Sequence, residues 1–184
     1  KNFEFLKILY KKNININNQD FKNEITPIMY TIILDDFEIF NFLLDKSDLN
    51  LQDNLGNNIM HYVIIYNKYN YINTIINFLK NNKNLLNLDN TNMFGKTPLH
   101  LLLDKLLINK KLLDIFDINF FIKNTNINLQ DNTGSTIFLM LCQNNLWIKF
   151  YDTLINKKIN YNIYNLNKEN ALYFIQDDLT AHFY

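Results

Sequence analysis

Apolar residues recur along this chain in pairs of short blocks separated by polar, Asn-rich segments. The first block of each pair is a run of mostly apolar residues, at 28–34, 59–66, 99–107, 137–142 and 172–175. The second block follows within a few residues, at 37–44, 71–79, 113–122 and 147–155, and the segment 3–10 has the same pattern. The spacing of apolar positions within the blocks is typical of short helices. The sequence therefore predicts pairs of short helices joined by polar turns.

Glycine and proline, the residues that restrict backbone geometry most, all stand at two places in this period. The three glycines, Gly56, Gly95 and Gly134, stand two residues before Asn58, Thr97 and Thr136, and both prolines, Pro27 and Pro98, directly precede a first block. The anchors Thr26, Asn58, Thr97, Thr136 and Asn170 start the successive copies. Their separations of about 32 to 39 residues lie in the range of solenoid repeats. The chain is therefore an internal repeat.

The residue before each first block predicts how the helix begins. Thr26-Pro27 and Thr97-Pro98 fit an N-cap followed by the first helical position, where proline's missing N–H costs nothing, and Thr136 stands at the same place. The connectors before these anchors, such as 48–53 and 126–131, are rich in Asn and Asp, which favour turns.

These motifs resemble those of ankyrin repeats, whose unit is a turn followed by an antiparallel helix pair with a Thr-Pro-Leu-His signature. Thr97-Pro98-Leu99-His100 matches the signature in full, whereas Asn58 to His61 and Thr26 to Met29 match in part. The resemblance implies an all-α solenoid of stacked antiparallel helix pairs with short turn or hairpin fingers. It implies one domain over 1–184, with repeats at 1–19, 20–52, 53–91, 92–130, 131–164 and 165–184, the first and last partial.

The sequence departs from this family pattern in two turns and at both ends. Asn23 stands where glycine is expected in the first turn, which has one extra residue, and Lys168 replaces glycine in the last turn. The chain starts with Lys, opens on the second helix of a repeat and closes inside another repeat, without polar capping repeats. We expect it to be part of a larger protein.

Composition narrows the class of partner. Lys+Arg and Asp+Glu balance at 18 each, and the sequence contains no arginine, so the basic surface that nucleic acids require is not expected. No uninterrupted apolar run is long enough to span a membrane. Cys142 is the one cysteine, which predicts a reducing, intracellular location in the cytoplasm or nucleus. Asn, at roughly a fifth of the chain, indicates an AT-rich genome.

No arrangement in the sequence predicts catalysis, a cofactor or a metal site. His61 and His100 fall at the family's His position, where the resemblance implies a hydrogen bond that ties neighbouring turns together. Cys142 is predicted to be a core residue, because a catalytic thiolate requires an electropositive, exposed setting. The pairs Asp35-Asp36 and Asp177-Asp178 fall at helix ends and are interpreted as turn residues, and His182 has no assigned role.

The remaining signal is a surface. The resemblance places one exposed position of each first helix, and the tips of the turns, along a concave groove. The helix positions are Tyr30, Tyr62, Leu101, Met140 and Phe174, and the turn tips are Phe21, Leu55, Met93, Phe94 and Thr133. Large apolar and aromatic side chains in a groove suit protein binding. The alternative is that a chain so rich in Tyr, Phe and Leu places these residues everywhere.

We expect a non-enzymatic scaffold or adaptor that binds a protein partner. The alternatives are a regulatory or targeting segment of a larger enzyme or channel, and a structural subunit of a stable assembly. In AT-rich organisms or large DNA viruses, similar proteins often act on host partners. The resemblance also marks the connector residues Asn50, Asn87, Asn128 and Asn162 as possible sites of asparagine hydroxylation.

Overall fold

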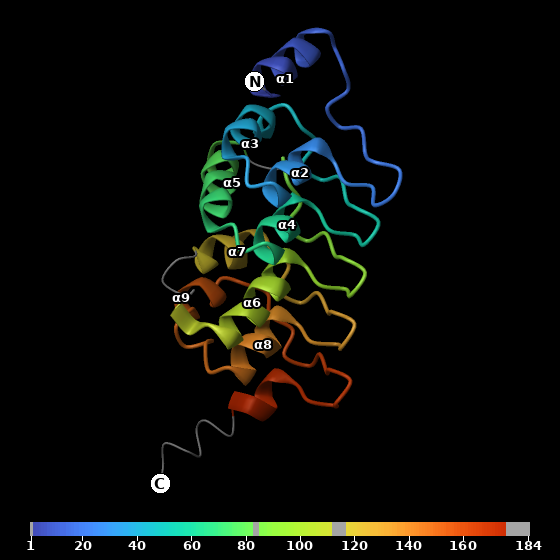
Figure 1. Cartoon of the computed structure of the whole chain (residues 1–184). Coiled ribbons are helices and arrows are strands. Elements are labelled where there is room, and N and C mark those ends of the chain that lie inside the picture. Colours follow the sequence, from blue (N-terminus) through green and yellow to red (C-terminus); the bar gives the residue numbers. More distant parts are fainter. Residues whose placement is uncertain (1, 83–84, 112–116, 176–184) are drawn as a thin grey trace. The chain divides into compact units, whose positions relative to one another are not determined.

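The computed structural model describes residues 2–82, 85–111 and 117–175, which belong to two compact units, one reaching Met93 and one starting at Phe94. The N-terminal unit contains α1 (Asn2–Lys11), α2 (Pro27–Ile33), α3 (Phe37–Leu44), α4 (Ile59–Ile65) and α5 (Tyr69–Asn81). The C-terminal unit contains α6 (Pro98–Ile108), α7 (Ile118–Asn124), α8 (Ile137–Gln143) and α9 (Tyr151–Leu154), and residues 171–175 are also helical. The regular elements described are helices, as expected for an all-α solenoid, with one isolated bridge between Gln130 and Thr136. Within each unit the first helices form one layer, the second helices another, and the turns project as fingers (Figure 1).

The predicted N-caps are confirmed at the first helices. The hydroxyl oxygens of Thr26, Thr97 and Thr136 accept hydrogen bonds from the backbone N–H three residues on, and Pro27 and Pro98 occupy the first helical position. Asn58 caps α4 in the same way. Each first helix therefore begins where a short polar side chain satisfies the free N–H groups of its first turn.

Three of the first helices, α2, α4 and α8, end in a common way. Asp35, Asn67 and Asn145, which follow α2, α4 and α8, have left-handed φ values of 58°, 57° and 54°. Asp and Asn tolerate this conformation better than other residues with a side chain, and it turns the backbone out of the helix. The chain can then reverse within a few residues into α3, α5 or the segment of α9.

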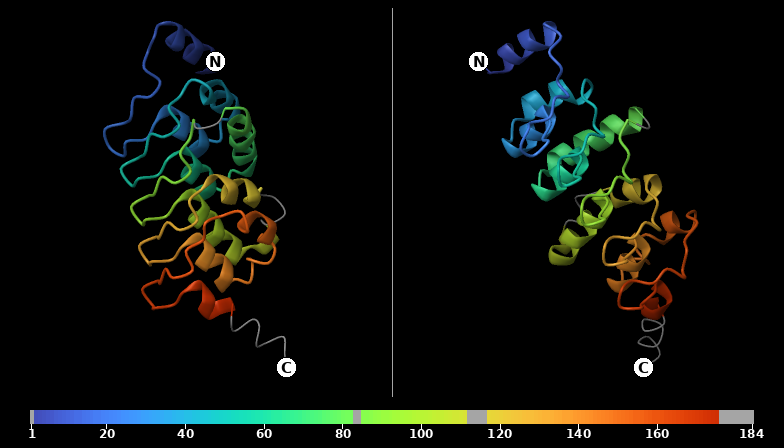
Figure 2. Two further views of the ribbon diagram at one scale, coloured as in Figure 1. Left: turned by 180° about the vertical axis from the view of Figure 1, so that it is seen from behind. Right: turned by 90° about the vertical axis from the view of Figure 1, so that its right-hand side faces the viewer.

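Each unit has its own apolar core. In the N-terminal unit the ring of Tyr71 on α5 packs edge-on against Phe37 and Phe40 of α3, at centroid distances of 4.9 and 4.7 Å. In the C-terminal unit α6 contacts α8, and the core includes Leu102, Leu103, Phe121, Leu141 and Cys142. Figure 2 shows the paired helices of each unit from two further sides. The prediction of a single domain over 1–184 with the repeat boundaries given above stays a prediction.

One predicted second helix, at 147–155, differs from the structure. The segment 147–155 is α-helical only in α9, because its first residues wind with i→i+3 hydrogen bonds such as Phe150 N–H to Trp147 C=O (3.2 Å) and Tyr151 N–H to Ile148 C=O (3.2 Å). These are turns of 3₁₀ type, which an apolar pattern alone does not distinguish from an α-helix. The predicted helix 113–122 lies partly outside the described residues and is represented by α7. In contrast, α3 has the predicted bounds 37–44.

The left-handed position of the first turn is Glu24 and not Asn23. Glu24 has a φ of 57°, and its N–H bonds the carbonyl of Asp20 four residues back, whereas Gly56 N–H bonds Asp53 three residues back. The extra residue of the first turn therefore lies before Glu24. Glu24 stands two residues before its N-cap Thr26, just as Gly56 stands two residues before Asn58. Lys168 is left-handed as its place in the register predicts, with a φ of 63°.

Candidate functional site: fingers and first helices

The fingers depend on a backbone conformation that glycine adopts readily. Gly56, Gly95 and Gly134 have φ values of 77°, 69° and 77°. A Cβ added at Gly56 would lie 2.9 Å from the Cα of Asn92 in the next finger, and one at Gly134 would lie 2.9 Å from the Cα of Asn165. Glycine is therefore required here by the left-handed φ and by the close approach of the neighbouring finger.

An aspartate or asparagine at the base organises most fingers. Asp53 Oδ1 accepts hydrogen bonds from the N–H groups of Leu55 (2.9 Å) and Asn57 (2.7 Å). Asp131 Oδ1 makes the same two contacts with Thr133 and Ser135, and Asn165 Oδ1 makes them with Asn167 and Glu169. Because one oxygen holds two N–H groups of the turn, the finger is fixed before any partner arrives.

Backbone hydrogen bonds join neighbouring fingers within each unit. In the N-terminal unit Asn54 N–H donates to the carbonyl of Asn23 (2.9 Å), and Met93 N–H donates to that of Leu55 (2.8 Å). In the C-terminal unit the pairs are Asn132 to Phe94 (3.0 Å) and Leu166 to Thr133 (2.9 Å). Gln19, Gln52 and Gln130 add side-chain bonds, since each amide donates to a carbonyl of its own finger and to one of the next repeat.

His100 connects two neighbouring turns, as the resemblance implied. Thr97 N–H donates to His100 Nδ1 (3.2 Å), and His100 Nε2 lies 3.2 Å from the carbonyl oxygen of Ser135 in the next finger. Nε2 must carry the proton for this second contact, so the ring is the neutral tautomer with Nδ1 as acceptor. Burial lowers the pKa of His100 and favours that neutral form. His61 is buried and forms the equivalent capping box with Asn58.

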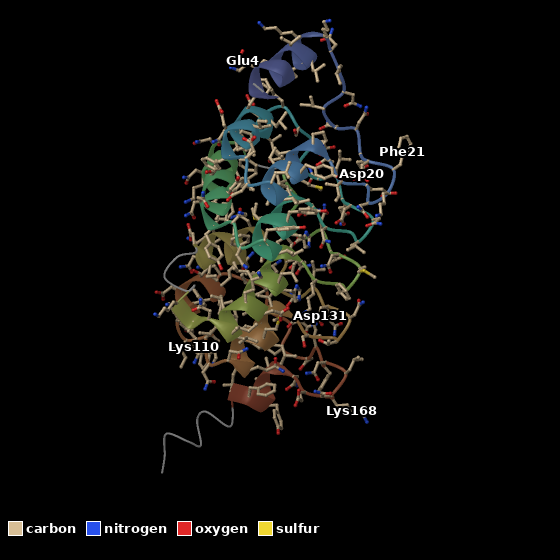
Figure 3. The ribbon with its side chains drawn as sticks, in the orientation of Figure 1. Glu4, Asp20, Phe21, Lys110, Asp131 and Lys168 are labelled. Carbon is tan, nitrogen blue, oxygen red and sulfur yellow. The ribbon has the colours of Figure 1, made fainter. Side chains whose placement is uncertain are left out.

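The finger tips carry exposed apolar side chains. Phe21 extends fully into solvent, with a relative exposure of 110%, and its position at the end of the first finger is seen in Figure 3. Leu55 and Met93 are exposed in the N-terminal unit, and Phe94 and Thr133 in the C-terminal unit. Leu166, which is also exposed, was missed by the sequence analysis. Leu166 stands four residues before the anchor Asn170, just as Met93 stands four residues before Thr97. This spacing would have identified Leu166 as a tip residue.

The helix positions do not form a uniformly exposed column. Tyr30 is exposed, and Leu101 and Phe174 are half-buried, but Tyr62 and Met140 are buried, so the expected exposure is wrong for these two. Tyr62 lies on α4, which α2 of the preceding repeat contacts, and this packing buries it. Both tyrosines also turn back to the base of their own finger. Tyr62 Oη donates to Asp53 Oδ2 (2.9 Å), and Tyr30 Oη donates to Asp20 Oδ2 (3.3 Å).

Nothing in the described residues assembles into a reactive centre. Among residues 2–82, 85–111 and 117–175, no group of three or more His, Cys, Asp or Glu side chains could hold a metal ion. Cys142 is buried in α8 as predicted, and Asp36 caps α3. Asp177, Asp178 and His182 lie outside the described residues. No helix in the part of the chain that the structure describes is long and apolar enough to cross a membrane.

Two of the connector asparagines, Asn50 and Asn128, have structural roles. Asn50 accepts from Asn87 N–H (2.7 Å) and donates to the carbonyl of Leu85 (3.0 Å). Asn128 bonds Asn160 N–H and the carbonyl of Lys158 in the same manner. These side chains therefore join consecutive connectors, and their hydroxylation stays a prediction.

Comparisons with known proteins agree with this architecture. A family model of ankyrin repeats in three copies matches residues 1–85. The ankyrin repeat protein L371 of Acanthamoeba polyphaga mimivirus is 32% identical over 198 aligned positions, which cover 95% of this chain and 25% of the relative. The chain thus spans about a quarter of that relative's length. The crystal structure of the ankyrin repeat protein EF0377 superposes with a TM-score of 0.67 and 17% identity, covering 96% of this chain and 85% of that one. With the repeated turns, caps and helix pairs, these findings identify the chain as an ankyrin repeat protein.

Proposed function

We propose that this chain is a non-enzymatic scaffold or adaptor that binds a protein partner through its fingers and the exposed parts of its first helices. Ankyrin repeats generally mediate protein–protein interactions, and the family and fold are typically non-catalytic. The observation that carries the proposal is the row of tips Phe21, Leu55 and Met93 on fingers joined by backbone hydrogen bonds. Apolar side chains held this way lose little entropy on binding, which favours affinity.

The helix residues contribute unequally to this proposed surface. Tyr30 is exposed and Leu101 and Phe174 are partly accessible, so they can meet a partner directly. Tyr62 and Met140 are better suited to support the surface from beneath. The aromatic ring of Tyr62 stacks on Tyr66, which is itself exposed, at a centroid distance of 5.8 Å.

The experiment is affinity capture with the chain immobilised and quantitative mass spectrometry of the bound proteins. Replacing Phe21, Leu55 and Met93 together by serine should reduce capture of the specific partner at least tenfold, because exposed anchor residues dominate interface energetics. The matched control replaces three exposed apolar residues of the second-helix segment 147–155, Ile148, Tyr151 and Ile155, by serine. Equal capture by the two triple variants would contradict the proposal.

A regulatory or targeting role within a longer polypeptide is the second candidate, because the mimivirus relative is about four times as long as the aligned region. A catalytic or channel domain on the same polypeptide would favour it over a free adaptor. The viral source of the relative and the AT-rich composition support a host protein as the partner. The proposed location is inside the cell, in the cytoplasm or nucleus.

A further inference from the structure

A hollow of about 360 Å³ opens on the N-terminal unit where α3 runs into the connector that follows it. Its lining comes from the stretch between Leu44 and Asn50, from Phe78 of α5 and from Leu85 of the next connector. These lining residues belong to no finger, so the hollow plays no part in the function proposed above.

The internal repeat identifies the equivalent place in the C-terminal unit. Asn50 Nδ2 donates to the carbonyl of Leu85 (3.0 Å), and Asn128 Nδ2 donates to that of Lys158 (2.8 Å). Each of these asparagines also accepts the N–H of the residue two positions after that carbonyl. Asn50 is therefore in register with Asn128, and Leu85 with Lys158.

A lysine ammonium occupies this place in the C-terminal unit. Lys157 Nζ donates to the carbonyl oxygens of Lys123 (2.9 Å) and Thr125 (2.8 Å), at the end of α7. The last carbonyls of a helix lack partners within the helix, and a cation near them also interacts favourably with the helix dipole. The connector pair therefore accommodates a lysine side chain and binds its ammonium at two oxygens.

The N-terminal unit has the same two acceptors without the lysine. Counting back from Asn50, the carbonyls of Asp45 and Ser47 are in register with the two that Lys157 binds. The residue in register with Lys157 is Asn84, which carries no ammonium. In the part of the chain that the structure describes, neither carbonyl accepts a hydrogen bond. Both oxygens are therefore available to a donor from outside.

A buried hydroxyl in the hollow adds a third acceptor. Ser47 Oγ is buried and has no hydrogen-bond partner among the described residues. The hydroxyl of its counterpart Thr125 is satisfied, because it donates to the carbonyl of Phe121 (2.9 Å). A buried hydroxyl without a partner is costly, and a donor that entered the hollow would remove this cost.

The charges around the hollow favour a cation. Lys46 Nζ pairs with Asp45 Oδ1 and lies 4.7 Å from the ring centroid of Phe42, so the charges of Lys46 and Asp45 offset each other. Asp48 Oδ1 accepts the N–H of Asn50 (2.9 Å), and the described residues form no ion pair with Asp48. Asp48 therefore leaves the hollow with an unbalanced negative charge beside the negative end of the α3 dipole.

We propose that the hollow binds a primary alkylammonium group, the group that ends a lysine side chain or a free diamine. Its three N–H donors match the carbonyl oxygens of Asp45 and Ser47 and one further oxygen, from Ser47 Oγ or Asp48. Its alkyl chain packs on Phe78 and Leu85, as lysine stems do on apolar surfaces. Neutral ligands lack the charge, and quaternary ammonium ligands lack the donors.

Two matched probes test the requirement for an ammonium. N-acetyl-lysine N-methylamide carries the group, and N-acetyl-norleucine N-methylamide has a similar alkyl chain without it. The full chain, with ¹³C-labelled Leu methyl groups, is titrated with each probe by NMR. We expect shifts at Leu44, Leu49 and Leu85, and a dissociation constant about five- to tenfold lower for the lysine probe, because hydrogen bonds to charged groups are the stronger kind.

Cadaverine, a free diamine, distinguishes the two sources of the ammonium. Tighter binding of cadaverine than of the lysine probe would assign the hollow to a free diamine, and the reverse would assign it to a lysine of a protein partner. Either result supports an alkylammonium site.

Removing the charge of Asp48 tests the electrostatic part. Asp48→Asn should weaken binding of the lysine probe about two- to fivefold, as for a partly exposed ion pair, and leave the norleucine probe unchanged. Asn keeps the oxygen that accepts the N–H of Asn50, so the connector stays intact. The matched control is Glu38→Gln, an exposed carboxylate in the first turn of α3, which should leave both affinities unchanged.

The variant Lys157→Ala extends the test to the occupied counterpart. It frees the carbonyls of Lys123 and Thr125, so the lysine probe should bind there. The urea midpoint of this variant, read from the fluorescence of Trp147, should rise with the lysine probe and not with the norleucine probe.

Several results would overturn the proposal. These are equal affinities for the lysine and norleucine probes, no binding of the lysine probe at millimolar concentration, and no effect of that probe on Lys157→Ala. Tighter binding after Lys83→Met, at a lysine outside the described residues, would mean that the chain fills the hollow itself and would also overturn it. The serine variant at Phe21, Leu55 and Met93 should bind the lysine probe normally, so that a failure of the finger surface and a failure of this hollow are distinguishable.

Discussion

The two compact units share one frame and differ in what they expose on their first helices. Both have left-handed turn residues, Thr or Asn N-caps and backbone bonds between fingers. The last helical position and the C-cap after it hold Ile33 and Leu34 at α2, and Ile65 and Tyr66 at α4. Counted from the N-cap, the same positions hold Asp104 and Lys105 in α6, and Gln143 and Asn144 in α8.

The repeated backbone geometry and the exposed surface are therefore specified by separate residues. The frame residues are buried or hydrogen-bonded within their own repeat, and they recur because the geometry of the turn requires them. The surface residues have no such constraint and vary between repeats, which is where a partner can be distinguished. At these two register positions Leu34, Ile65 and Tyr66 are apolar and exposed, whereas α6 carries its exposed Leu107 and Ile108 further along the helix. The N-terminal unit is therefore the better candidate for binding at these positions.

The strongest test concerns the turn geometry that both units share, and it replaces glycine by alanine in one finger of each unit. Gly56→Ala and Gly134→Ala both force a Cβ onto the backbone of the next finger at a left-handed φ. Each should lower the free energy of unfolding by roughly 2–3 kcal/mol. Urea denaturation followed by far-UV circular dichroism reports the whole chain, and the fluorescence of Trp147, the one tryptophan, reports the C-terminal unit.

The control for this pair is Asn54→Ala, at an exposed tip position, which should change stability by less than about 0.5 kcal/mol. A glycine variant as stable as this control would mean that its finger tolerates a side chain, and the two units would then not share a frame.

The difference between the exposed surfaces is tested by placing polar residue types of the C-terminal unit on α4 of the N-terminal unit. Ile65→Gln with Tyr66→Asn copies Gln143 and Asn144 onto α4. Capture of the specific partner should fall about tenfold, because apolar contact area is lost, while the urea midpoint stays unchanged. In the C-terminal unit, Asp104→Asn with Lys105→Gln serves as the control and should leave capture intact. If both double variants lose the partner equally, binding is not concentrated in the N-terminal unit.

Acid should destabilise the C-terminal unit through His100. Its pKa is lowered in the folded chain, chiefly by burial, so below the ordinary histidine pKa of about 6.5 the unfolded chain takes up the proton first. The contribution of His100 to stability is complete above that pH and is lost as the pH falls toward and through the folded-state pKa. Urea midpoints from Trp147 fluorescence should therefore fall between pH 7.5 and 5.5.

The variant His100→Gln isolates this effect, because glutamine keeps hydrogen-bonding capacity but does not titrate in this range. The variant should be less stable at pH 7.5 and show a flatter pH dependence than the natural chain. Identical slopes for the two proteins would assign the acid sensitivity to other groups.

The frame could be predicted from the sequence because its residues act locally. Thr97, Pro98 and Gly95 each set the backbone at their own position, so their spacing was enough to place α6 and its finger. Exposure was harder to predict, because it depends on where a side chain turns. Tyr30 and Tyr62 occupy the same register position, yet only Tyr62 is buried. Tyr30 is exposed because it lies on a face that no described helix pair covers.

The smallest effect concerns the two fingers that lack glycine, one in each unit. Glu24 and Lys168 hold left-handed φ values of 57° and 63°, which cost a residue with a side chain more than glycine. Glu24→Gly and Lys168→Gly should each raise the free energy of unfolding by about 0.5–1 kcal/mol, since relief of backbone strain exceeds the added entropy of the unfolded chain. Urea denaturation at pH 7.5 measures both, with Asn23→Gly as the control that should not stabilise. If Asn23→Gly stabilised the chain and Glu24→Gly did not, the left-handed residue of the first turn would be Asn23, as the sequence pattern indicated.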